Sequence, residues 1–177
     1  MFYLNEFPDQ EVHTNYSQKY KDYNIDKFLT CVYLLKTGSE ALKAFESFLS
    51  KYNLSQAKFL TLMILFRSPE ESLTPSEIAR IMGVKKPTST GVIDGLLKEN
   101  YVTRELDETD RRKIKIKISS KGSDHLDKIL PEYFKYINKI MDEFSGEECS
   151  DFKDLLFKVL LNTEKIGDSH HQSYGLR

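Results

Sequence analysis

A run of basic side chains is the part of the sequence with the clearest capacity for chemistry. From Arg111 to Lys121 there are six basic residues and no acidic one, although the whole chain carries 26 Lys and Arg against 27 Asp and Glu. Guanidinium and ammonium groups bind anions, and phosphate above all. Because the formal net charge of the chain is only -1, this local excess indicates a local anionic partner. The near-neutral net charge excludes a general polycation that coats nucleic acid.

Isoleucines alternate with lysines in the same segment, which is typical of a half-exposed strand. The preceding segment YVTREL, residues 101–106, also has the pattern of a strand, and DETD, residues 107–110, that of a turn. Together they predict a hairpin, or wing. A basic outer face alone is more often an ordinary solvated surface. The alternation assigns Ile114, Ile116 and Ile118 to the core and Lys113, Lys115 and Lys117 to solvent.

Two short helices are predicted just before the hairpin. The segment LTPSEIARIMG, residues 73–83, opens with a capping box of Thr74 and Glu77 and closes with Gly83, a residue that accepts the left-handed conformation. Three residues later a second helix opens at Pro87, in PTSTGVIDGLLKEN, and Asn100 is its expected left-handed terminator. Two short helices joined by a tight turn form a helix-turn-helix.

Longer amphipathic helices flank this unit. Apolar residues spaced three and four apart predict helices over residues 25–49, 119–144 and 151–166, and a further buried helix follows an N-cap at Ser55. Their apolar stripes exceed what a small winged helix can cover, which favours a symmetric partner. The expected fold is mainly α with a small β wing. It comprises an N-terminal arm (1–23), a helical dimerisation region (24–52 and 119–166), a winged helix-turn-helix DNA-binding region (53–118) and a C-terminal tail (167–177).

A winged helix-turn-helix gives the basic residues a specific task. Its second helix enters the major groove by its first turn, and arginines at a wing tip enter a neighbouring minor groove. The candidate DNA-binding residues are the base readers Lys86, Thr88, Ser89 and Thr90, the phosphate-binding Lys85 and Lys113, and the minor-groove Arg111 and Arg112, with Asp107 and Asp110 shaping the wing turn.

The segment from residue 73 to residue 122 resembles the DNA-binding core of the MarR family of transcription regulators. In that family the wing ends in D-x-x-D-R-R and is followed by a strand and a Ser/Thr-x-x-Gly helix start. The resemblance extends over about residues 25–166 and implies a homodimer on palindromic double-stranded DNA, often released by a small phenolic or aromatic ligand or by thiol oxidation. It implies a repressor of transcription that a ligand releases. The residues that carry the pattern are Asp107, Asp110, Arg111, Arg112, Ser119 and Gly122.

Two departures from the family pattern keep alternatives open. Gly91 and Gly95 stand in the recognition helix where larger, often basic residues are common, and each glycine costs about 0.5–1 kcal/mol relative to alanine. The first alternative is therefore an interaction scaffold without DNA binding. The second is a peroxide-sensing regulator that uses Cys31, although the activating tyrosines of that branch fall at Leu35 and Phe45. A lone cysteine on an apolar helix is more often a core residue.

Other classes of protein find no support in the sequence. The N-terminus MFYLNEFPDQ has no signal-peptide pattern and no apolar run could span a membrane, so we expect a cytoplasmic protein without a membrane partner. Cys31 and Cys149 lack metal or CxxC spacing and are interpreted as free thiols. The four histidines form no metal motif, and GxSxG, HExxH and phosphate-loop patterns are missing. We expect neither an enzyme nor a metal or cofactor.

Overall fold

The computed structural model describes residues 9–67, 72–106 and 113–173, the last seven of these by their backbone only. The chain divides into two compact units, Met1–Leu126 and Asp127–Arg177. Helices make up most of the described residues, and they are accompanied by one antiparallel pair of strands. The expectation of a mainly α fold with a small β wing is confirmed.

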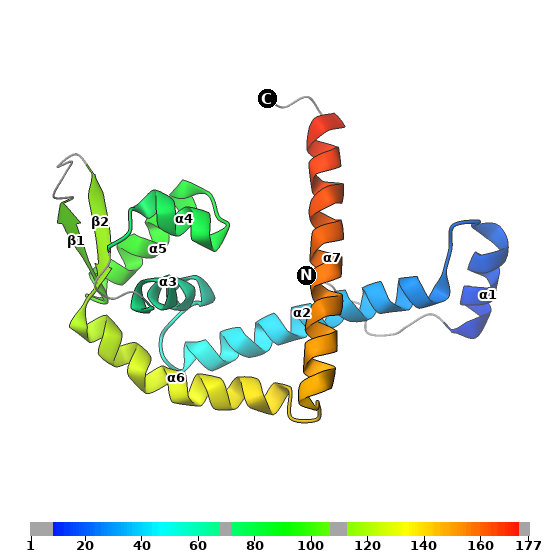
Figure 1. Ribbon diagram of the computed structural model, residues 1–177, viewed down its shortest axis with the longest axis horizontal. Helices are drawn as coiled ribbons and strands as arrows, with labels where there is room; N and C mark the ends of the chain where they lie inside the picture. Colours follow the sequence, from blue (N-terminus) through cyan, green and yellow to red (C-terminus); the bar gives the residue numbers. More distant parts are fainter. Residues whose placement is uncertain (1–8, 68–71, 107–112, 174–177) are drawn as a thin grey trace. The chain divides into compact units, whose positions relative to one another are not determined.

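Figure 1 shows the order of the elements along the chain. Unit 1 contains all of them up to the start of α6, and unit 2 contains the rest of α6 together with α7. The elements are α1 (Gln10–Lys19), α2 (Ile25–Ser50), α3 (Gln56–Phe66), α4 (Pro75–Met82), α5 (Lys86–Lys98), β1 (Val102–Leu106), β2 (Ile114–Ile118), α6 (Ser120–Ile140) and α7 (Gly146–Ser173).

Short polar side chains start the helices as the sequence predicts. The Ser55 hydroxyl accepts the backbone N–H of Lys58 at the start of α3, at 3.3 Å. At the start of α4 the capping box of Thr74 and Glu77 is complete, with bonds of 3.2 Å and 2.7 Å between the two residues. Such a cap contributes about 1 kcal/mol to helix stability. Local chemistry therefore fixes where these helices begin.

Two residues with positive φ end the short helices. Gly83 closes α4 at φ 66° and Asn100 follows α5 at φ 60°. Both left-handed terminators are as predicted from the sequence. The second of them matters for the sheet, because Tyr101 N then donates to Leu96 O and the chain turns directly into β1.

The core of unit 1 lies between the winged-helix elements. Helices α3, α4 and α5 pack on one another, while β1 packs on α5 and β2 packs on α3 and α4 (Figure 1). In the sheet, β1 and β2 are antiparallel with Val102 opposite Ile118 and Leu106 opposite Ile114. Side chains with relative exposure of 2% or less include Leu62, Leu65, Ile78, Ile93, Leu96 and Ile116.

A third segment joins the sheet just before α4. Leu73 N donates to Ile116 O at 3.0 Å, and Ile116 N donates to Leu73 O at 2.7 Å. Through this isolated bridge the residue in front of the helix-turn-helix is paired with the wing strand. The sequence pattern had not indicated this pairing, because a single residue has no period.

The assignment of Ile114 to the core is wrong. Its side chain is 44% exposed, and Leu106, which lies opposite it in the sheet, is 64% exposed. Ile116 and Ile118 are buried as expected. Period two fixes which side of a strand a residue faces, but here the hairpin continues beyond the helices that cover that side.

The N-terminal stretch expected as an arm contains the helix α1. Asp9 caps it by accepting the N–H of Val12 at 3.0 Å. His13 on this helix is buried and hydrogen-bonded to the Tyr23 hydroxyl, and their rings stack with centroids 6.1 Å apart. Burial raises the pKa of Tyr23 above its ordinary value. Apolar spacing could not predict α1, because aromatic contacts and an N-cap stabilise this helix rather than an apolar stripe.

Unit 2 carries a long exposed apolar surface. Helix α7 begins at Gly146, earlier than predicted, because Glu148 and Ser145 form a cap with bonds of 2.9 Å and 3.2 Å. No helix among the described residues has the length and apolar character that crossing a membrane requires. The large apolar side chains exposed on α7 are Phe152, Leu155, Leu156, Phe157, Val159, Leu160, Leu161 and Ile166.

Candidate nucleic-acid interface

The first turn of α5 presents cationic and hydroxyl side chains to solvent. Lys85 occupies the N-cap position without a side-chain capping bond, and Lys86, Thr88 and Thr90 are exposed. The Thr90 hydroxyl donates to Lys86 O at 3.0 Å, so its lone pairs remain available. A helix N-terminus carries partial positive charge, and the nearby lysines add to it. This turn can therefore bind an anion and present hydrogen-bonding groups beside it.

Ser89 does not belong to this exposed set, contrary to the prediction. Its side chain is fully buried, and its hydroxyl donates to Pro75 O in α4 at 3.3 Å. Ser89 lies four residues before Ile93 and seven before Leu96, both buried, so it shares their face of the helix. That spacing was visible in the sequence. In this structure Ser89 links α5 to the start of α4 and cannot reach bases.

The start of α4 is stabilised electrostatically as well as by its cap. The backbone N–H and hydroxyl of Thr74 donate to the Glu77 carboxylate and hold the pKa of Glu77 below its ordinary value, with smaller contributions from Lys115 and Arg80. A carboxylate at a helix N-terminus is favourable because the end of the helix carries partial positive charge. At neutral pH the Glu77 carboxylate is therefore charged and stabilises the start of α4.

The wing contributes cations of differing exposure. Lys113 is exposed, whereas Lys115 and Lys117 are half-buried rather than fully turned to solvent. The four remaining candidates lie outside the described residues: the DNA-binding Arg111 and Arg112, and Asp107 and Asp110, which were predicted to shape the wing turn.

An ion pair that the sequence reading missed joins the wing to α5. Arg104 Nη2 in β1 lies 2.6 Å from Asp94 Oδ1, and both side chains remain about half exposed, at 52% and 47%. Arg104 is two residues after the buried Val102, so period two puts it on the strand face toward α5. An arginine at such a position calls for an acidic partner, and this signal could have identified the pair. Arg104 thus partly neutralises the negative charge that Asp94 places on α5.

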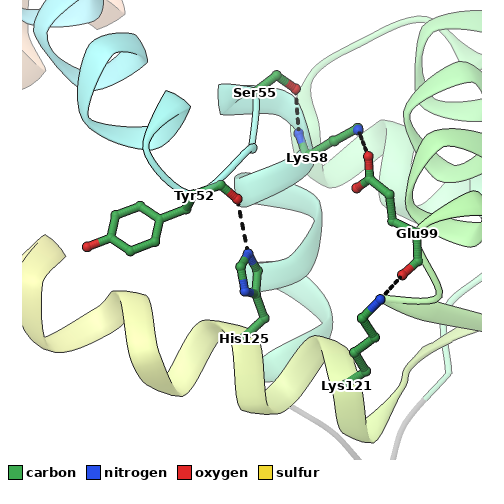
Figure 2. Close-up of polar contacts among 6 residues, drawn as sticks. All are labelled: Tyr52, Ser55, Lys58, Glu99, Lys121 and His125. Atoms are coloured by element: carbon green, nitrogen blue, oxygen red, sulfur yellow. Dashed lines mark hydrogen bonds and ion pairs between the residues drawn. The ribbon is translucent and has the colours of Figure 1, made fainter.

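A second set of polar contacts fixes the C-terminal end of α5 (Figure 2). Lys58 Nζ in α3 donates to Glu99 Oε1 at 2.6 Å, and Lys121 Nζ in α6 donates to Glu99 O at 2.8 Å. Gly95 leaves room for the first of these bonds, since a Cβ there would lie 3.0 Å from Lys58 Cε. The glycine at position 95 therefore has a structural explanation within the chain.

Aromatic stacking ties the start of α6 to the same region. The rings of Tyr101 and His125 stack with centroids 4.7 Å apart and an interplanar angle of 9°. His125 Nε2 donates to Tyr52 O at 3.2 Å, as Figure 2 shows, and Lys121 Nζ lies 5.1 Å from the Tyr101 ring centroid. Tyr101, three residues beyond the end of α5, is thus held against α6, and His125 links α6 in turn to the residues that follow α2.

Cys31 is exposed on α2, so its interpretation as a small core residue does not hold for the single chain. Leu35 one turn later is also exposed and, as noted from the sequence, cannot donate a hydrogen bond to a thiolate. Cys149 is a free thiol as well. Among the described residues no group of three or more His, Cys, Asp or Glu is placed to hold a metal ion.

Comparison with known proteins relates the chain to one family. The sequence profile of the MarR family matches residues 54–114, which run from the start of α3 into the wing. Over 157 residues the chain is 30% identical to the HTH-type transcriptional repressor YetL of Bacillus subtilis (strain 168), covering 89% of this chain and 92% of the relative. The likeness therefore extends beyond the winged helix to the flanking helices.

Solved structures show the same fold. The complex of S. aureus MepR with DNA superposes with a TM-score of 0.67 at 21% identity, over 73% of this chain and 96% of that chain. CouR from Rhodococcus jostii RHA1, bound to p-coumaroyl-CoA, gives a TM-score of 0.64 at 20% identity, over 73% and 90% of the two chains. The winged-helix architecture predicted from the sequence is confirmed.

Proposed function

The chain belongs to the MarR family and is a DNA-binding transcription regulator, and we propose that it acts as a homodimeric repressor that recognises a palindromic duplex through α5 and the wing. The exposed first turn of α5 is the observation that carries the proposal. It combines the positive end of a helix, two lysines and two threonine hydroxyls on a helix that α3, α4 and β1 hold in place. The relative YetL is named a repressor, which supports the sign of regulation.

Each candidate residue except Ser89 has a role in this proposal. Lys86, Thr88 and Thr90 contact base edges in the major groove, and Lys85 and Lys113 bind phosphates. The wing-tip arginines Arg111 and Arg112 enter the minor groove, supported by Asp107 and Asp110 in the turn. Ser89 is left out of this set because its side chain is buried.

A second copy of the chain is the proposed occupant of the apolar helix surface. The phenylalanines, leucines, valine and isoleucine of α7 are exposed within fifteen positions, from Phe152 to Ile166, and soluble monomers rarely leave large apolar patches uncovered. Two winged helices related by a twofold axis contact two half-sites about one turn of DNA apart, which gives the selectivity that one winged helix lacks. We propose that α2, α6 and α7 form the dimerisation region, as the sequence analysis expected.

A small aromatic ligand is the proposed release signal. CouR, which shares the fold, is named as binding p-coumaroyl-CoA, an aromatic acyl thioester. A ligand that binds the free protein better than the DNA-bound protein shifts the population away from DNA.

Salt-dependent DNA binding tests the function. The probe is the duplex that the wild-type protein selects from a randomised double-stranded pool. Lys85→Ala should weaken binding and reduce the slope of log affinity against log salt by about one, because one phosphate contact is lost and one fewer counterion is released. Arg112→Ala should do the same. The matched control Lys21→Ala removes an equal charge from an exposed position between α1 and α2 and should leave the affinity unchanged.

Selection of no duplex by the wild-type protein would refute DNA recognition and favour the interaction scaffold. An affinity and slope unchanged in Lys85→Ala would remove the start of α5 from the interface. Peroxide treatment of wild type and Cys31→Ser separates the thiol-sensing alternative, since only that mechanism predicts DNA release that the serine variant loses.

A further inference from the structure

The two unusual glycines of α5 have different surroundings. A Cβ at Gly95 would meet the stem of Lys58, so this glycine serves the ion pair with Glu99. A Cβ at Gly91 would meet nothing within 4 Å, and Gly91 is not among the described residues with positive φ. Neither packing nor backbone conformation within the chain explains the glycine at position 91.

Glycine inside a helix is destabilising relative to alanine, because the unfolded chain is freer and no side chain packs on the neighbouring turns. Position 91 lies in the middle of α5, away from both ends of Lys86–Lys98. An alanine there would fit the helix and the surrounding space. Folding alone would therefore favour alanine, and the reason for glycine has to lie outside the chain.

Helix geometry puts Gly91 at the centre of the exposed face. It is two residues away from the buried Ser89 and Ile93, and at about 3.6 residues per turn it points away from both. The exposed Pro87 is one turn before it on the same face. One turn after it, Asp94 is engaged by Arg104 at 2.6 Å. At the middle of this face no side chain projects from the backbone, and the threonines and lysines of the first turn lie beside it.

We propose that Gly91 is the point where the backbone of α5 comes closest to DNA, and that the missing side chain sets how deeply the helix sits in the major groove. A Gly with no Cβ is the residue that permits close approach of backbone to a ligand. With the helix at this depth, the short hydroxyl side chains of Thr88 and Thr90 reach base edges that a longer side chain at position 91 would hold away. The inference rests on the proposed function and deepens it, since it names Gly91 as a residue that determines specificity.

A size series at position 91 tests the proposal. Gly91→Ala and Gly91→Leu both introduce good helix formers, so each should raise Tm by about 2–4 °C. Affinity for the duplex selected by the wild-type protein should fall about tenfold with alanine and further with leucine. The salt slope should stay unchanged, because no charge is removed. A residue with a merely structural role would not separate stability from binding in this direction.

Asn15→Ala is the control, because it also introduces a good helix former at an exposed position, in α1, outside the α5 turn, the wing and the proposed dimerisation region. It should leave DNA affinity at the wild-type level. Wild-type affinity in Gly91→Leu would overturn this inference while the proposed function stands. Failure of the wild-type protein to select any duplex would overturn both.

Discussion

Gly122→Ala should destabilise the protein strongly, because the start of α6 is packed closely against Tyr101, three residues beyond the end of α5. A Cβ at position 122 would lie 2.1 Å from Tyr101 O and 3.0 Å from both Tyr101 C and Ile118 Cγ1. The Tyr101 carbonyl cannot simply turn away, since it accepts the N–H of Ser119 at 3.0 Å. Relief therefore requires the start of α6 to move away from the end of α5.

The size of the effect follows from what that movement breaks. Besides the bond to Tyr101 O, the Ser119 hydroxyl donates to Asn100 O at 2.7 Å and accepts Gly122 N at 3.0 Å. Overpacking costs about 1–3 kcal/mol and each weakened hydrogen bond about 1 kcal/mol, whereas alanine returns up to about 1 kcal/mol of helix propensity. With all three bonds weakened, a net loss of about 3–5 kcal/mol in the free energy of unfolding is expected.

Urea unfolding followed by far-ultraviolet circular dichroism measures this loss. Wild type and variant are compared at one protein concentration, because the stability of a dimer depends on concentration. Gly146→Ala, with open space around its new methyl group, should be at least as stable as wild type. Wild-type stability in Gly122→Ala would refute the argument that close backbone contact requires glycine at this position.

Two further predictions concern the helix pair. Ser89→Ala removes the hydrogen bond to Pro75 O and should lower the free energy of unfolding by about 0.5–1.5 kcal/mol without changing DNA affinity. Thr88→Ala should instead weaken DNA binding with little change in stability. Urea unfolding and gel shifts measure the two effects, and a binding defect confined to Ser89→Ala would contradict the placement of Ser89 in the core and Thr88 at the DNA. Hydrogen bonds from Thr74 lower the pKa of Glu77 in the folded state, so the carboxylate stabilises the fold above its ordinary pKa and this contribution is lost as the pH falls through the folded pKa. The difference in free energy of unfolding between wild type and Glu77→Gln, measured by urea unfolding, should therefore be present at neutral pH and shrink in acid. A difference that widens in acid would refute this direction of the pH dependence.

The sequence predicted best the features that depend on neighbouring residues. The capping box of Thr74 and Glu77 and the left-handed ends at Gly83 and Asn100 were all predictable, because their hydrogen bonds close within a few residues. The family resemblance rests on the same short-range patterns together with the wing.

Features that depend on contacts distant in sequence could not be predicted. The exposure of Ile114 depends on where the covering helices end, and the bond from Lys58 to Glu99 spans 41 positions. The burial of Ser89 is different, since its spacing from Ile93 could have revealed it. Whether the first-turn side chains read bases stays a prediction, because their exposure permits contact with DNA but does not demonstrate it.

The bridge between Leu73 and Ile116 also bears on how the protein avoids aggregation. The strand IKIKI is short, rich in β-branched residues and, without cover, a template for pairing with another chain. Pairing with β1 occupies one of its edges, and Leu73 occupies the other edge at its central residue. The lysines within the strand, Lys115 and Lys117, repel a second copy of the same strand. These features disfavour pairing of β2 with the same strand of another copy of the chain.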